Sequence, residues 1–326
     1  MDRRTFMGAL AGLPLAGANV TRSFAQDAWT PTRTIKMVVP FAPGGSTDVA
    51  ARLIGQAISE RVGQSMVIEN RAGAGGNIAA EFVARADPDG YTLMMATSTT
   101  HATNSFLYKN LRFDPIRDFT PISQTMFIPN LLVVNPELPV RSLDELIAYG
   151  KANPGKLNYG TGGPGTSLHL SAALFGHLTK IEMVHVPYRG GALVATDLIS
   201  GKIQLAFNPM VEVIEQVKAG LLRPLGVTGR TRSALLPDVP AIGERLPGYE
   251  IALWNGIVGP AGMPPGSAAR YAREIAAALK TSEMRAKIVA QGSEPVGSMP
   301  EEFTAFIATE QPKWAELVRI SGATAG

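Results

Sequence analysis

The chain has 326 residues, of which 45% are hydrophobic and 17% are charged. This composition fits a packed globular protein with enough chain for two lobes, and it excludes a disordered or coiled-coil protein. Cysteine is absent, which excludes thiol nucleophiles, cysteine-ligated metals and disulfides. The four histidines show no metal-ligand spacing, and the formal net charge of +3 is not gathered in a basic run. We therefore expect no metal and no nucleic-acid partner.

The N-terminus has the form of a bacterial export signal. A twin-arginine pair, Arg3 and Arg4, precedes an apolar stretch at 8–20 that is too short to span a bilayer. Small residues at the two positions that a signal peptidase reads predict cleavage after Ala25. Residues 1–25 are thus an expected signal peptide and the mature protein is expected in the periplasm, exported either folded or unfolded.

Strands alternate with helices over the first third of the chain. The predicted strands are 34–41, 66–69 and 91–96, and the predicted helices begin near residues 46 and 78. A Gly-rich turn joins the first strand to the first helix, and Ser46, Thr47 and Asp48 are predicted to cap that helix. Such alternation predicts a mostly parallel, doubly wound sheet with helices on its faces.

The same alternation continues in a second half. Strands are predicted at 131–134, 157–159, 183–187 and 204–207, and helices at 142–151, from 168, at 192–199, at 267–280 and at 300–319. We place crossovers near Pro136 and Pro139 and around Trp254. These crossovers predict one lobe of residues 26–135 and 256–326, and a second lobe of residues 136–255.

Several Gly-rich turns lead from a predicted strand into a predicted helix. A helix N-terminus exposes backbone N–H groups that bind an anion, and glycine lets a ligand approach the backbone closely. Parallel strands bring such turns to the same edge of a sheet, so turns from two lobes can face each other across a cleft. This arrangement predicts a binding cleft for a small anion.

Enzymatic alternatives have weaker support in the sequence. Gly160, Gly162 and Gly165 fit the dinucleotide fingerprint, so an exported NAD(P)-dependent oxidoreductase is the second hypothesis, although Pro164 stiffens that segment. Ser167 and His169 are two residues apart on a predicted helix and do not face each other as a catalytic pair would. We therefore expect a protein that is not an enzyme. A third hypothesis is an orphan receptor that presents its ligand to a signalling partner.

Four motifs resemble the Bug (TctC-like) solute-binding proteins of tripartite tricarboxylate transporters. They are residues 39–48, 69–77, 87–93 and 186–191, in family order, and the resemblance extends from about residue 34 to 319. It implies an α/β periplasmic binding protein, type II-like, with a mostly parallel sheet in each of two lobes and a ligand cleft between them. It further implies a small carboxylate-bearing ligand, delivery to a two-component membrane permease, and no cofactor. A monomer suits such delivery.

The resemblance also implies a set of ligand-binding residues in the turns of both lobes. Asp48 has two readings, contact with a cationic group of the ligand or support of the helix N-terminus. The ligand itself cannot be carried over, because the polar wall of the cleft varies within the family. The implied ligand-binding residues are Phe41, Ala42, Gly44, Ser46, Asp48, Thr97, Ser98, Tyr159, Gly160, Thr161, Thr166, Ser167, His169 and Asn208.

Overall fold

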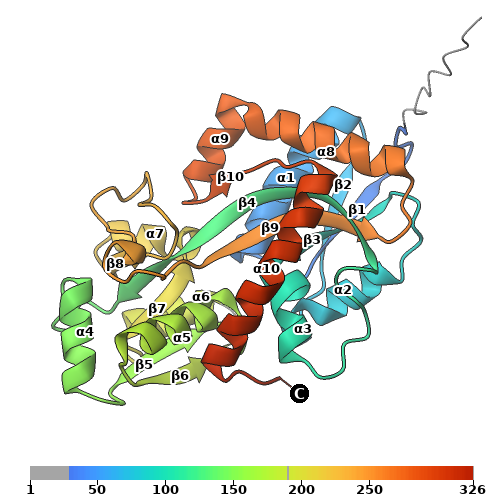
Figure 1. Ribbon diagram of the computed structural model, residues 1–326. Helices are drawn as coiled ribbons and strands as arrows, with labels where there is room; N and C mark the ends of the chain where they lie inside the picture. Colours follow the sequence, from blue (N-terminus) through green and yellow to red (C-terminus); the bar gives the residue numbers. More distant parts are fainter. Residues whose placement is uncertain (1–28, 189–190, 326) are drawn as a thin grey trace, which may run out of the picture.

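A computed structural model describes residues 29–188 and 191–325 of the chain. The predicted signal peptide, residues 1–25, lies outside the described residues. Figure 1 shows an α/β protein whose two lobes share one curved sheet. The strand order is β2-β1-β3-β9-β4-β7-β5-β6, and β8 and β10 also pair with β4.

The first lobe contains the parallel strands at one end of the sheet. Apolar side chains alternate between its two faces: Met37 packs with Ile54 of α1, whereas Val38 packs with Val83 of α2. The strands are apolar on both faces because a helix covers each face. These elements are β1 (Ile35–Val39), α1 (Ser46–Val62), β2 (Met66–Asn70), η1 (Ala74–Gly76), α2 (Asn77–Ala84) and β3 (Thr92–Thr97).

The second lobe contains the parallel strands at the other end. Strand β5 lies between β6 and β7 and is parallel to both. The predicted helix start at Ser142 is confirmed, because Ser142 Oγ accepts a hydrogen bond from Glu145 N at 3.1 Å. The elements are α4 (Leu143–Ala152), β5 (Leu157–Thr161), α5 (Ser167–Thr179), β6 (Met183–Pro187), α6 (Gly191–Ile199), β7 (Leu205–Pro209), α7 (Met210–Lys218), β8 (Arg223–Val227) and η3 (Ile242–Glu244).

Two long strands connect the lobes and make the centre of the sheet antiparallel. Strand β4 (Phe119–Val134) pairs with β9 (Ala252–Pro260) up to residue 129, and with β7 from residue 130. The predicted strand 131–134 is therefore only the end of β4. Register shifts near Pro121 and Gln124 break the apolar alternation that would have indicated the rest of the strand.

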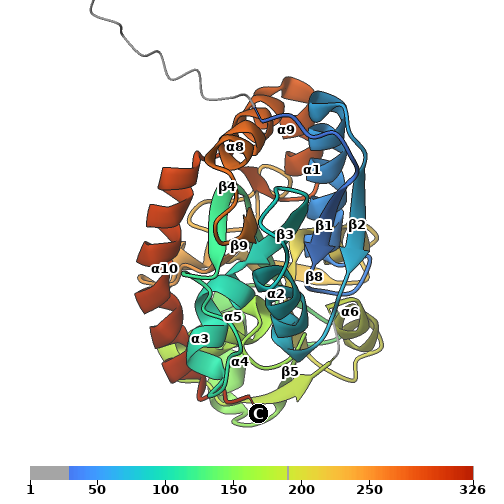
Figure 2. The same cartoon turned by 90° about the vertical axis from the view of Figure 1, so that its right-hand side faces the viewer.

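The C-terminal helices pack against both lobes. Helix α8 (Pro265–Lys280) lies on α1 and β4, and α9 (Ser282–Val289) leads to β10 (Glu294–Pro295). Helix α10 (Pro300–Ser321) runs along one side of the molecule, from β4 and η2 (Thr99–Thr103) to α5 (Figure 2). Within the described ranges, no helix is long and apolar enough to cross a membrane.

Candidate functional site

The turn after β1 leaves the N-terminus of α1 without a side-chain cap. Gly44 has φ of +84°, in the left-handed region that favours glycine. The N-cap is Gly45, and the predicted caps Ser46, Thr47 and Asp48 lie inside the helix instead. Backbone N–H groups at the start of α1 therefore depend on partners from outside the helix. Among the residues of this turn implied by the resemblance, Ala42 and Gly44 are exposed.

Asp48 lies in the first turn of α1 and stabilises the Gly-rich loop that precedes this helix. Its Oδ2 accepts hydrogen bonds from Gly44 N at 2.9 Å and Arg52 Nε at 3.0 Å, and its Oδ1 accepts from Asn70 Nδ2 at 2.9 Å. Burial alone would raise the pKa of Asp48, but these hydrogen bonds outweigh it and hold the pKa below its ordinary value. Asn70 Nδ2 also donates to Phe41 O. Both oxygens of Asp48 thus have partners within the protein.

We predict that Asp48→Asn lowers the free energy of unfolding by about 1–3 kcal/mol. The amide loses the charge that faces Arg52, and its NH₂ group meets the Gly44 N–H or the Asn70 amide. Urea unfolding measures the change, with Glu60→Gln, an exposed position on the same helix, as the control expected within about 0.5 kcal/mol of the parent. Unchanged stability with weaker ligand binding would instead assign Asp48 to the ligand.

The end of β3 supplies a second polar segment. Thr97 N donates to Thr100 Oγ1 at 3.1 Å, Thr100 N donates to Thr97 Oγ1 at 3.2 Å, and Thr100 Oγ1 lies 2.9 Å from His101 Nδ1. Ser98, between them, is fully buried, and its hydroxyl has no hydrogen-bond partner in the part of the chain that the structure describes. Thr97 is therefore held by its neighbours, whereas the Ser98 hydroxyl is free to contact a ligand.

In the second lobe, the turn between β5 and α5 carries several of the implied residues. Thr166 is the N-cap of α5, and its hydroxyl donates to Gly163 O at 2.8 Å and accepts from His169 N at 3.5 Å. Ser167, the first helical residue, is buried. Thr161 Oγ1 accepts a hydrogen bond from Gly163 N at 3.1 Å. The hydroxyls of Thr161 and Thr166 thus shape this turn.

Three aromatic rings stack beside this turn. The ring of His185 lies between neighbours, with centroid distances of 5.2 Å to Tyr159 and 4.2 Å to His169. His169 Nδ1 accepts from Gly165 N at 3.2 Å, and His185 Nε2 lies 2.6 Å from Thr161 Oγ1. Burial, with the His185 charge adding to it, lowers the pKa of His169 to about 4. No group of three metal-ligating side chains occurs within 29–188 and 191–325.

Packing accounts for two glycines of the dinucleotide-like pattern. A Cβ at Gly160 would press on Ile203 and Val194, which lie inside the second lobe. A Cβ at Gly165 would collide with Leu107, which follows the first-lobe segment η2. Both glycines therefore permit close approach between protein segments, and their presence does not require a nucleotide.

Glu212 is a candidate site residue that no sequence motif indicates. It lies in the first turn of α7, and its Oε1 accepts a hydrogen bond from Ser46 N at 3.1 Å. A carboxylate of the second lobe thus reaches the uncapped N-terminus of α1 in the first lobe. Burial raises the pKa of Glu212, and hydrogen bonds from Ser46 only partly offset that effect. Acidic residues are common in the first turn of a helix, where they stabilise the positive end of the helix dipole. The sequence alone therefore gives no sign that Glu212 contacts another helix.

Buried polar atoms without partners gather where the lobes meet. Asn255 on β9 pairs in register with Thr97, directly before Ser98. Asn130 lies where β4 passes from β9 to β7, and Asn208 lies on the adjoining part of β7. Ser98, Asn130, Asn208 and Asn255 are fully buried, and each has at least one side-chain N or O atom without a partner among the described residues. Because buried polar groups are normally paired, these atoms mark a place for a bound molecule.

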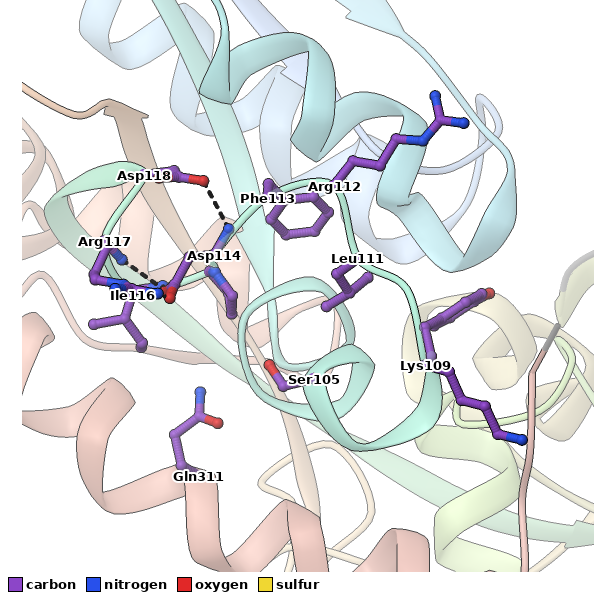
Figure 3. A pocket seen from close by; sticks show the side chains of 12 residues that line it. Ser105, Lys109, Leu111, Arg112, Phe113, Asp114, Ile116, Arg117, Asp118 and Gln311 are labelled. Atoms are coloured by element: carbon purple, nitrogen blue, oxygen red, sulfur yellow. Dashed lines mark hydrogen bonds and ion pairs between the residues drawn. The ribbon is translucent and has the colours of Figure 1, made fainter.

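A surface hollow lies apart from this junction. It has a volume of about 680 Å³ and lies between α3 (Asn104–Leu107), the following loop and α10, with Ser105 and Gln311 on two of its sides (Figure 3). Within the loop, Asp114 accepts a hydrogen bond from Arg117 Nε at 2.7 Å. None of the residues implied by the resemblance lines this hollow, so we place the candidate site at the junction of the lobes.

Known proteins similar to this chain share its length and fold. Residues 50–322 match the tripartite tricarboxylate transporter family receptor. Protein BugT of Bordetella pertussis is 35% identical over 317 residues, which cover 97% of each chain. The structure of R. palustris Rpa4515 with adipate has a TM-score of 0.86 and 39% identity, covering 90% of this chain and 99% of that one.

A second solved structure, MatC (Rpa3494) from Rhodopseudomonas palustris with bound malate, has a TM-score of 0.81 and 31% identity, covering 88% of this chain and 99% of that one. These similarities confirm the predicted two-lobed α/β fold and the resemblance found in the four sequence motifs. The chain belongs to the Bug (TctC-like) family of tripartite tricarboxylate transporter receptors.

Proposed function

We propose that this protein captures a small carboxylate-bearing ligand at the junction of its lobes and delivers it to the two-component permease of a tripartite tricarboxylate transporter. The observation that carries the proposal is the set of buried, unpartnered polar atoms on Ser98, Asn130, Asn208 and Asn255. They come from segments of both proposed lobes, so a molecule that contacts all of them bridges the lobes. Two relatives support the ligand class, since their structures hold adipate and malate.

Hydroxyl and backbone donors give the junction its affinity for a carboxylate. The Ser98 hydroxyl has no other partner among the described residues, and the start of α1 presents backbone N–H groups at the positive end of the helix dipole. A buried carboxylate needs such donors to replace its water shell. No step of bond making or breaking is required of these groups, and we propose binding without catalysis.

Closure of the lobes around the ligand is the proposed conformational step. The lobes are proposed as residues 26–135 with 256–326, and residues 136–255. Two strands lead from one to the other: β4 changes its partner between Pro129 and Asn130, and β9 begins at Ala252. A hinge at such strand positions needs to alter only a few backbone angles.

The proposed location is the periplasm, with export directed by residues 1–25 and cleavage after Ala25. A monomer is proposed, since it can expose both lobes to the permease. The exported protein would then meet its ligand outside the cytoplasmic membrane and the permease in that membrane.

A thermal-shift screen of the chain from Gln26 tests the proposal. The screen contains mono-, di- and tricarboxylates, acidic amino acids, aromatic carboxylates and NAD(P). A ligand at about 100 times its dissociation constant adds roughly 2.7 kcal/mol to the stability of the folded state, so a clear rise in Tm is expected with one class of carboxylate. A rise with NAD(P) alone would support the oxidoreductase instead.

Two matched glycine variants test the position of the site. Gly44 and Gly63 flank the two ends of α1, both have positive φ, and an added Cβ at either meets no atom within 4 Å. We expect Gly44→Val and Gly63→Val to cost a similar 1–3 kcal/mol or so of stability, because valine is strained at positive φ. Only Gly44→Val is expected to weaken binding, measured by calorimetry, and equal affinities for the two variants would place the ligand away from this turn.

A further inference from the structure

Glu212 connects the two lobes at the proposed ligand site. Its Oε1 accepts a hydrogen bond from Ser46 N at 3.1 Å, and its Oε2 lies 3.5 Å from Asn208 Nδ2. Two glycines leave room for the carboxylate: a Cβ at Gly191 would collide with Oε2, and a Cβ at Gly45 would lie 3.8 Å from Oε1. One backbone N–H group at the start of α1, that of Ser46, thus already binds a carboxylate of the protein.

Glu212 Oε2 and Asn208 Oδ1 have few hydrogen-bond donors around them. Asn208 Nδ2 is committed to Gly191 O at 3.0 Å, so it contributes only a long contact to Glu212 Oε2. Asn208 Oδ1 has no hydrogen-bond partner in the described part of the chain, although Asn208 is fully buried. No lysine or arginine within 29–188 and 191–325 forms an ion pair with Glu212. The Asn208 amide oxygen therefore has no donor among the described residues, and it lies beside a carboxylate that accepts hydrogen bonds but has no positively charged partner among them.

We propose that Glu212 and Asn208 bind an ammonium group of the ligand, so that the protein selects a carboxylate that also carries an amino group. An ammonium has three N–H donors and a positive charge, and it satisfies both a carboxylate and an amide oxygen. The Ser98 hydroxyl and the Asn255 amide, also buried and unpartnered among the described residues, supply donors for the ligand carboxylate. The inference rests on the proposed function, since it names the class of carboxylate that the same site takes.

The hydrogen-bond partner of Glu212 distinguishes it from an acid that caps the helix on which it lies. An acid that serves its own helix accepts from N–H groups of that helix. Glu212 accepts instead from Ser46 of α1, 166 positions away in the chain. Glu212 is half-buried, and a half-buried charge without a counter-charge carries a desolvation cost. A ligand that brings an ammonium lowers that cost on binding.

Matched ligands that differ at one carbon test the proposal. Succinate, malate and aspartate carry hydrogen, hydroxyl and ammonium at the same position, and adipate and 2-aminoadipate form a longer pair. Calorimetric titration of the mature protein at pH 7.5 is expected to give at least about tenfold tighter binding of the amino form in the series that binds, equivalent to 1.4 kcal/mol. Tighter binding of the unsubstituted or hydroxyl form would overturn the proposal.

Two Glu→Gln variants of α7 separate the role of Glu212 from the effect of removing a negative charge from this helix. Glu212→Gln keeps the size but removes the charge, and it is expected to lose the preference for the amino form by about tenfold. Glu215→Gln, at an exposed position of α7 that pairs with Lys218, is expected to keep the parent preference. A preference that survives in Glu212→Gln would overturn the proposal.

The Tm of the ligand-free protein shows whether Glu212 is kept for binding or for stability. A half-buried carboxylate that has no counter-charge among the described residues destabilises the empty protein, so Glu212→Gln is expected to have an unchanged or higher Tm at pH 7.5. A lower Tm would make Glu212 a structural link between α1 and α7, and it would overturn the proposal. If no carboxylate of either series binds the parent protein, the proposed function fails as well, whereas binding without an amino preference contradicts only this inference.

Discussion

Glu310→Ala is expected to lower the free energy of unfolding by about 3–5 kcal/mol. Glu310 Oε2 accepts hydrogen bonds from two indoles, Trp254 Nε1 at 3.0 Å and Trp314 Nε1 at 2.5 Å. Both tryptophans are fully buried, and Glu310 is 8% exposed. Alanine leaves two buried N–H donors without an acceptor, each at a cost of about 1–3 kcal/mol, and it opens a cavity between α10 and β9.

The measurement is urea unfolding of the mature protein, followed by tryptophan fluorescence. Glu316→Ala is the matched control, because Glu316 lies on the same helix, is exposed and forms an ion pair with Arg319 at the surface. A surface pair of this kind contributes about 0–1 kcal/mol. Glu310→Gln keeps one acceptor oxygen and should fall between the two. A loss below about 1 kcal/mol in Glu310→Ala would mean that α10 does not depend on this contact.

Lowering the pH from 7 to 5 is expected to cost about 4 kcal/mol of stability through two histidines. Burial lowers the pKa of His101 from 6.5 to about 3, and burial together with the His185 charge lowers that of His169 to about 4. The unfolded chain therefore takes up protons near pH 6.5, whereas the folded protein does not. The contribution of the two neutral histidines to the free energy of unfolding is complete above pH 6.5 and is lost as the pH falls toward 4.

The pH dependence is measured by urea unfolding at several pH values. His101→Gln and His169→Gln should each remove about 2 kcal/mol of the loss between pH 7 and 5, even where they change the stability at pH 7. His177→Gln, at an exposed position on α5, controls for the loss of a histidine as such. A parent-like pH dependence in both buried variants would show that carboxylates, not these imidazoles, control acid unfolding.

Glu310 and His101 each contact a segment that carries a residue of the candidate site. Trp254 is next to Asn255, whose amide faces the junction of the lobes without a partner among the described residues, so the Glu310 contact keeps β9 and its Asn255 in place. His101 follows Ser98 and contacts Thr100. Neutral His101 therefore helps to hold the segment that carries the Ser98 hydroxyl.

Local sequence patterns predicted the outer elements of each lobe well. The β1 strand, the capping box at Ser142 and the helix after Thr166 depend on side chains a few residues apart. The central strands were harder to predict. β4 is interrupted by register shifts, and its antiparallel pairing with β9 joins residues more than 120 positions apart, so neither feature leaves a periodic pattern in one stretch of sequence.

Motifs and hydrophobic periodicity are local properties, so they were enough to predict the family, the alternation of strands and helices, and the Gly-rich turns. Which polar groups have hydrogen-bond partners depends on the packing of distant segments and is visible in the folded structure alone. It gave both oxygens of Asp48 partners within the first lobe, and it brought Glu212 of the second lobe to Ser46. Contacts between distant segments depend on how the lobes pack, which is why a site residue such as Glu212 could not be read from its neighbours in the chain.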